Sequence, residues 1–207
     1  LGNNQGSEMG EGWSDFLALL AMTQASDRKR TGNDLFQGTY AVGIYAGAND
    51  PRSGYFGIRR YPYSTDLSKN PLTFKHIQNG VALPAEIPVA YGADGADNAE
   101  LHNAGEVWGA MLWEAYVALL NDTGRLTFEQ ARDRMLDYLV ASLQLTPTDP
   151  TFLEARDALL AVAKARDLAD YQAIWGAFAK RGAGVNAKAP RRYSIDNQGV
   201  EEDFSTP

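Results

Sequence analysis

Apolar residues recur at helical spacing in four successive segments between residues 104 and 182, a pattern that favours a helical chain. The first of these helices is expected at about 104–120, and the second opens with a capping box at 127–130. The third starts near Thr151, with Glu154 three residues on, and the last ends in Lys-Arg-Gly at 180–182, a typical helix stop. The second helix is predicted to bury one apolar stripe: Met135, Leu136, Leu139, Val140 and Leu143.

A further helix is predicted near the start of the chain, from about residue 10 to residue 29. It places Glu11 and Asp15 on one face, four residues apart, and three apolar residues on a core-facing stripe: Trp13, Leu17 and Leu20. A carboxylate at the mouth of a buried helix is costly unless an Arg, a Lys or a metal ion meets it. The plainer interpretation is that acidic residues in a first turn complement the helix dipole.

Residues 35–98 differ in kind. β-Branched and aromatic residues at 38–45 predict a strand, and Pro62 favours extended backbone at 57–63. Prolines interrupt 64–98, which we expect to be an ordered loop. Asp94 and Asp97 could hold calcium, although their spacing is not that of an EF-hand and a solvated turn is the plainer interpretation. The expected fold is mainly α, with about five helices and one extended, proline-rich excursion.

Charge and composition exclude several classes of function. Lys and Arg total 19 against 26 Asp and Glu, and the net charge of -7 argues against a binder of nucleic acid or anionic membranes. No apolar run approaches the roughly 20 residues that span a bilayer, and the opening residues show no signal-peptide pattern. There are no cysteines and only two histidines, His76 and His102. One copy of the chain therefore cannot build a metal site from three imidazoles.

Few residues stand out as candidates for chemistry. His102, just before a predicted helix, is either a cap or buried hydrogen-bonding group or a general acid or base. Arg59 and Arg60 suit surface ion pairs, although one of them could clamp a carbonyl or carboxylate. Glu106 reads as a helix-surface carboxylate and His76 as structural. The sequence contains no Gly-x-Ser-x-Gly, no phosphate-binding glycine loop and no H-E-x-x-H.

Several long motifs nevertheless occur together. Gly-Glu-Gly-Trp-Ser-Asp-Phe stands at 10–16, and Gly-Ile-Arg-Arg-Tyr-Pro-Tyr-Ser-Thr-Asp at 57–66 is followed by Asn-Pro-Leu-Thr at 70–73. A His-x-x-Gly-Glu-Val-Trp motif begins at residue 102, and further matching segments lie at 150–158, 178–182 and 203–205. In this order the motifs resemble the fungalysin family of secreted zinc metallopeptidases, which is similar to thermolysin.

The resemblance implies a role for each residue that carries it. Glu11 would be the glutamate of a two-histidine, one-glutamate zinc site, the ligand set known from thermolysin. Asp15 would orient a ligating histidine. His102 would stabilise the oxyanion of the tetrahedral intermediate, and Arg59, rather than Arg60, would hold a substrate carbonyl.

The chain departs from the family pattern in one respect. The family's H-E-x-x-H, which supplies two zinc ligands and the general base, lies upstream of the motif at 10–16 and is absent from residues 1–207. Residues 1–207 are therefore expected to be the C-terminal helical lobe of a catalytic domain, inactive alone. The implied partners are the N-terminal lobe, a propeptide and a protein or peptide substrate, in an extracellular setting.

Two other interpretations remain. A non-catalytic helical interaction module on a peptidase scaffold would have Glu11 and Asp15 in salt bridges and an apolar patch along the aromatic residues at 55–63. The second of the two is a calcium-binding structural domain.

Overall fold

The computed structural model describes residues 2–47 and 49–207, and it confirms a mainly α fold. The long helices are α1 (Asn4–Met22), α3 (Leu101–Asn121), α4 (Phe128–Leu145), α5 (Phe152–Arg166) and α6 (Leu168–Lys180). They correspond to the five predicted helices. The short helix α2 (Ser53–Phe56) and two 3-10 turns, Ala25–Lys29 and Phe74–Ile77, lie in or beside the excursion. None of the helices in the described ranges is long and apolar enough to cross a membrane.

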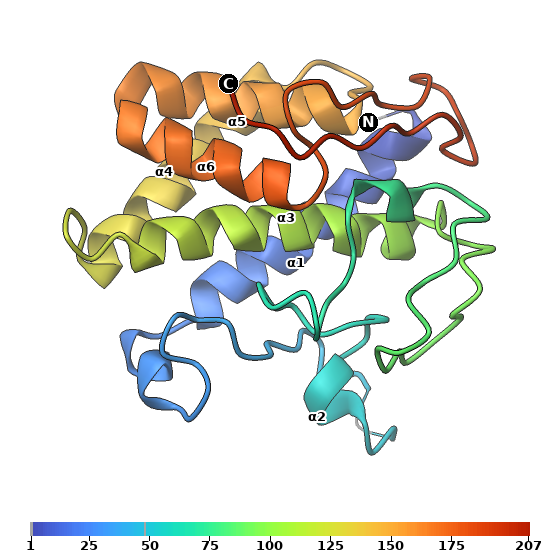
Figure 1. Cartoon of the computed structure of the whole chain (residues 1–207), viewed down its shortest axis with the longest axis horizontal. Helices are drawn as coiled ribbons and strands as arrows, with labels where there is room; N and C mark the ends of the chain where they lie inside the picture. Colours follow the sequence, from blue (N-terminus) through green and yellow to red (C-terminus); the bar gives the residue numbers. More distant parts are fainter. Residues whose placement is uncertain (1, 48) are drawn as a thin grey trace.

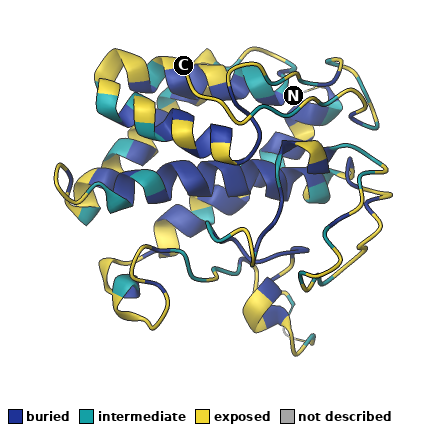
Figure 2. Ribbon diagram, in the orientation of Figure 1, coloured by how far each residue is buried: buried dark blue, intermediate teal, exposed yellow. Residues whose placement is uncertain are grey.

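Helix α3 is the centre of the molecule. It runs through the middle of the molecule, where α1 crosses behind it and α5 and α6 lie above it (Figure 1). Helices α1, α4 and α6 contact it. Figure 2 shows that nearly its whole length is buried. Buried residues lie on every face of this helix, from Ala104 to Leu120, as is expected of a core helix. The C-terminal end of α6 closes as predicted, since Gly182 adopts a positive φ of 81° beside the last turn.

Helices α1 and α3 cross where a glycine of each helix meets the other. A Cβ added to Gly105 of α3 would lie 2.6 Å from the Glu8 carbonyl oxygen of α1, and one added to Gly12 would collide with the Gly105 carbonyl. Only glycine allows backbones this close. The crossing holds residue 11 of α1 beside the first turn of α3, which carries His102.

The first helix differs from the prediction at both ends. It begins at Asn4, capped by the Asn3 side chain, which accepts from the Gly6 amide at 3.0 Å. It ends at Met22, so the basic residues at 28–30 follow it rather than close it. The core-facing stripe was also partly wrong, because Leu17 is 49% exposed. The crossing at Gly12 turns a different stripe inward: Met9, Gly12, Phe16 and Leu19.

The apolar stripe predicted for α4 is split between core and solvent. Met135 and Leu139 are buried, whereas Leu136, Val140 and Leu143 are exposed. One face of α4 meets α3 and α5, and Ala131, Tyr138 and Ser142 complete that face. The three exposed residues of the predicted stripe therefore lie outside the core.

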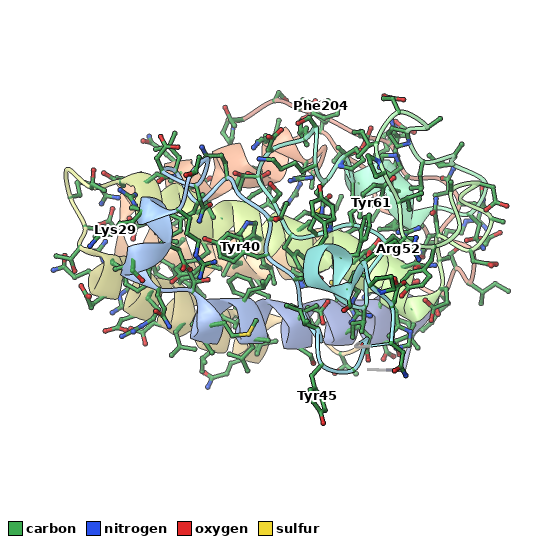
Figure 3. The ribbon with its side chains drawn as sticks, turned by 90° about the horizontal axis from the view of Figure 1, so that it is seen from below. Lys29, Tyr40, Tyr45, Arg52, Tyr61 and Phe204 are labelled. Atoms are coloured by element: carbon green, nitrogen blue, oxygen red, sulfur yellow. The ribbon has the colours of Figure 1, made fainter. Side chains whose placement is uncertain are left out.

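The excursion is irregular backbone rather than a strand. Among the described residues of the excursion, one β-bridge forms. It is antiparallel and joins Tyr40 to Tyr63, with N···O distances of 2.9 and 2.8 Å. The strand predicted at 38–45 does not form, because the chain turns at Gly43, whose φ is 66°. Seen from below, Tyr40 and Tyr61 lie over the body and Tyr45 points away from it (Figure 3). We call residues 57–63 the arginine arm.

Candidate active site

The four residues singled out in the sequence lie in one cluster. Glu11 and Asp15 come from α1, His102 from the first turn of α3, and Arg59 from the arginine arm. The glycine crossing of α1 and α3 and the bridge at Tyr63 bring these three elements together.

Arg59 and Asp15 form a buried, two-pronged ion pair. Arg59 Nε donates to Asp15 Oδ2 at 2.6 Å, and Nη2 donates to Oδ1 at 2.9 Å. The Tyr63 hydroxyl also donates to Oδ2, at 2.5 Å. Burial works to lower the pKa of Arg59, but the hydrogen bonds and charge of Asp15 outweigh it and raise that pKa above its ordinary value. Arg59 therefore stays charged at every working pH.

Glu11 is more loosely held. Its Oε2 lies 3.4 Å from Arg59 Nη2 and 3.6 Å from His102 Nε2, and its side chain is 35% exposed. Neither contact is a short hydrogen bond. The carboxylate thus faces solvent beside two basic groups and remains available to a further partner.

Glu100 orients His102, a contact that was not predicted from the sequence. Its Oε1 lies 2.6 Å from His102 Nδ1, while its Oε2 accepts from the amides of His102 and Asn103. Burial opposes the charged form of Glu100, but these hydrogen bonds lower its pKa overall. This turns Nε2 of the half-exposed His102 toward Glu11. An acidic residue two before a histidine at a helix start was the available signal.

Arg60 and Glu106 form a second buried pair, which corrects the expectation of surface charges. Arg60 Nε donates to Glu106 Oε1 at 2.5 Å, and the Arg60 amide donates to Oε2 at 2.8 Å. The other guanidinium nitrogens donate to Asn98 Oδ1 and to the Asn103 carbonyl. These charges are buried because the arginine arm lies against α3. The pair fixes the arginine arm to α3, and Arg59 pairs with Glu11 and Asp15 instead.

The remaining candidates do not form a site. His76 is buried, its Nδ1 accepts from the Thr73 amide at 2.9 Å, and burial lowers the pKa of its imidazole to about 4. It caps a 3-10 turn, as expected of a structural residue. Asp94 and Asp97 line a small pocket with Arg60. Across residues 2–47 and 49–207, no group of three or more His, Cys, Asp or Glu side chains is placed to hold a metal ion.

Residues 1–187 match the Fungalysin metallopeptidase (M36) family. The chain belongs to that family. Its relatives include the extracellular metalloproteinase mep of Aspergillus terreus, 31% identical over 91% of the chain, and that of Aspergillus fumigatus, 34% identical over 93%. The extracellular metalloproteinase 3 of Arthroderma otae is 32% identical over 92%. The chain spans 27% of the length of each of these three relatives.

The fungalysin family implies zinc, and the cluster fits one part of a zinc site. Glu11 presents a partly exposed carboxylate with no short hydrogen bond. Asp15, which could orient a ligand, stands one turn further along α1. A catalytic zinc site needs three protein ligands, and residues 2–47 and 49–207 hold no group of three that could supply them.

Glu8, one turn before Glu11, is a second acidic residue whose role was not predicted from the sequence. It is fully buried, and among the described residues no basic side chain pairs with it. Its carboxylate accepts from Asn4 Nδ2 at 2.6 Å and from Asn197 Nδ2 at 2.8 and 3.0 Å. Burial raises the pKa of Glu8 from 4.5 to about 8.

Glu8 should therefore give the fold a distinctive pH dependence. The folded chain keeps a proton that the unfolded chain releases above pH 4.5, so the stability from this proton is lost as the pH rises toward about 8. In urea unfolding, wild type should lose roughly 1.4 kcal/mol per pH unit across that window relative to Glu8→Gln. Glu129→Gln, at an exposed position of α4, should keep the wild-type slope. Parallel curves for wild type and Glu8→Gln would contradict this.

Proposed function

We propose that residues 1–207 are the C-terminal helical lobe of a secreted zinc endopeptidase. One observation carries the proposal: Glu11, Asp15, Arg59 and His102 converge in a chain of the fungalysin family. The other zinc ligands and the general base would come from polypeptide outside residues 1–207, in an N-terminal lobe. A zinc ion bound there would act as a Lewis acid and activate water for attack on the peptide bond.

Glu11 and Asp15 would serve the metal. Glu11 would supply a carboxylate oxygen from its partly exposed side chain. Among the described residues, Asp15 Oδ1 accepts one hydrogen bond, from Arg59 Nη2. Since a carboxylate oxygen accepts two, Oδ1 has room for the N–H of a ligating imidazole, which such a bond holds in one tautomer and orientation.

Arg59 and His102 would serve the substrate. Arg59 donates hydrogen bonds from Nε and Nη2 to the carboxylates of Asp15 and Glu11. Its third nitrogen, Nη1, would donate to a substrate carbonyl. A protonated imidazole donates from both ring nitrogens. Nδ1 of His102 would donate to Glu100 and Nε2 to the oxyanion that develops in the transition state.

The substrate class and setting follow from the same proposal. The relatives are named extracellular metalloproteinases, which supports a protein or peptide substrate and an extracellular location. A propeptide belongs to the proposal only through the resemblance to the family. The alternative, a non-catalytic interaction module, called for an apolar patch along 55–63. It also called for Glu11 and Asp15 in salt bridges, and both pair with Arg59. The patch does not form, because Phe56, Tyr61 and Tyr63 are buried and Tyr55 is the one exposed aromatic residue of 55–63.

Metal removal tests the proposal. The complete protein that contains residues 1–207 should hydrolyse an unfolded protein substrate, lose this activity with a zinc chelator, and regain it with buffered zinc. Residues 1–207 alone should neither retain zinc nor cleave, because they supply one ligand and no general base. Hydrolysis that resists the chelator, or cleavage by residues 1–207 alone, would overturn the proposal.

A further inference from the structure

We propose that Tyr63 is a positioning residue of this zinc centre, whose hydroxyl selects the Asp15 oxygen that is left for the ligating histidine. The inference rests on the proposed function and adds a residue outside the four already assigned. It comes from the way the hydrogen bonds divide between the two oxygens of Asp15.

The two oxygens of Asp15 are used unequally. Oδ2 accepts from Arg59 Nε at 2.6 Å and from the Tyr63 hydroxyl at 2.5 Å, which fills both of its acceptor positions. Oδ1 accepts only from Arg59 Nη2, at 2.9 Å, among the described residues. Without the tyrosine hydroxyl both oxygens would have one free position, and the carboxylate could receive the imidazole at either.

The Tyr63 side chain is itself tightly placed. Its backbone pairs with Tyr40, and its ring is buried against α3. A Cβ added to Gly109 of α3 would lie 2.7 Å from the Tyr63 hydroxyl oxygen, so the glycine makes room for it. Burial and the Asp15 charge raise the pKa of Tyr63 well above its ordinary value, which keeps the hydroxyl a donor.

The hydroxyl contributes more to direction than to attachment. Asp15 is already fixed to the arginine arm by two charge-assisted bonds from Arg59. The Tyr63 hydroxyl adds a third bond from the same arm. Its distinct effect is on the orientation of the carboxylate, which a zinc-bound imidazole would sense.

The experiment compares Tyr63→Phe with Tyr40→Phe in the complete zinc-loaded protein. Tyr40 is the bridge partner, and its hydroxyl accepts from Asn33 Nδ2 at 2.9 Å, away from Asp15. Zinc release to a chelator should be about 10-fold faster in Tyr63→Phe, the lower end for a group behind a metal ligand. Tyr40→Phe should release zinc at the wild-type rate, with a thermal midpoint similar to that of Tyr63→Phe.

A second variant moves the hydroxyl without removing it. Gly109→Ala should displace the Tyr63 side chain and speed zinc release as Tyr63→Phe does. Wild-type release rates in both variants, or equal acceleration in Tyr40→Phe, would overturn the assignment of Tyr63 while leaving the zinc peptidase intact. A wild-type protein that never bound zinc would instead overturn the proposed function, and this inference with it.

Discussion

Replacing Glu11 by glutamine in the complete protein should abolish zinc retention and peptidase activity while the lobe stays folded. Glutamine keeps the size of the side chain but loses the anionic oxygen that zinc prefers. Activity should fall by more than about 100-fold, since even a residue behind a metal ligand is worth roughly 10- to 100-fold. The fold should tolerate the change, because Glu11 is partly exposed and makes no short hydrogen bond.

Metal analysis and a peptidase assay check this result against a matched control. Glu129→Gln makes the same chemical change at an exposed position of α4 and should keep full zinc and full activity. Normal zinc content and activity in Glu11→Gln would refute the role of Glu11 as a ligand.

Replacing Glu106 by alanine should have the largest effect on stability. Glu106 is buried and receives two hydrogen bonds from Arg60. Its removal leaves the buried guanidinium without its counter-charge, which costs about 3–5 kcal/mol. Urea unfolding of residues 1–207 should show this loss, and the arginine arm, with Arg59, should loosen first.

The double variant Arg60→Met/Glu106→Leu tests whether the loss in Glu106→Ala comes from the unpaired charge of Arg60. It removes both charges and keeps apolar side chains in their place. Replacing both members of a buried pair by apolar residues is often nearly neutral, so the double variant should recover much of the stability lost by Glu106→Ala. A Glu106→Ala loss below about 1 kcal/mol, the value of an ordinary exposed pair, would contradict the account.

Local signals in the sequence predicted the helices well. Thr127 and Thr151 cap α4 and α5 through the expected reciprocal bonds with residues three further on, because capping depends only on neighbours in the chain. The same holds at Gly182, which follows α6. The ends of α1 were harder, since its start depends on Asn3, whose amide also donates to the distant Pro150 carbonyl.

Contacts between distant segments could not be predicted. Burial of Arg60 and Glu106 depends on the arginine arm folding onto α3, 46 residues apart in sequence. The strand expected at 38–45 is reduced to one bridge at Tyr40, because the chain turns at Gly43. Exposure of Leu17 and Val140 likewise follows from which helix faces meet.

The candidate site was predicted by resemblance, not by spacing. Spacing alone placed Glu11 and Asp15 on one face of a helix. Nothing in the local sequence places His102 near Glu11; the contact at Gly12 and Gly105 does so. Glu100 and Tyr63, which complete the hydrogen bonds of His102 and Asp15, became visible only in the structure.

A zinc-edge anomalous map of the complete protein tests the central claim most directly. It should show one zinc ion about 2.0–2.2 Å from a Glu11 carboxylate oxygen, with two imidazole ligands from outside residues 1–207 and Asp15 Oδ1 accepting from one of them. Zinc bound elsewhere, or a zinc site complete without Glu11, would contradict the account.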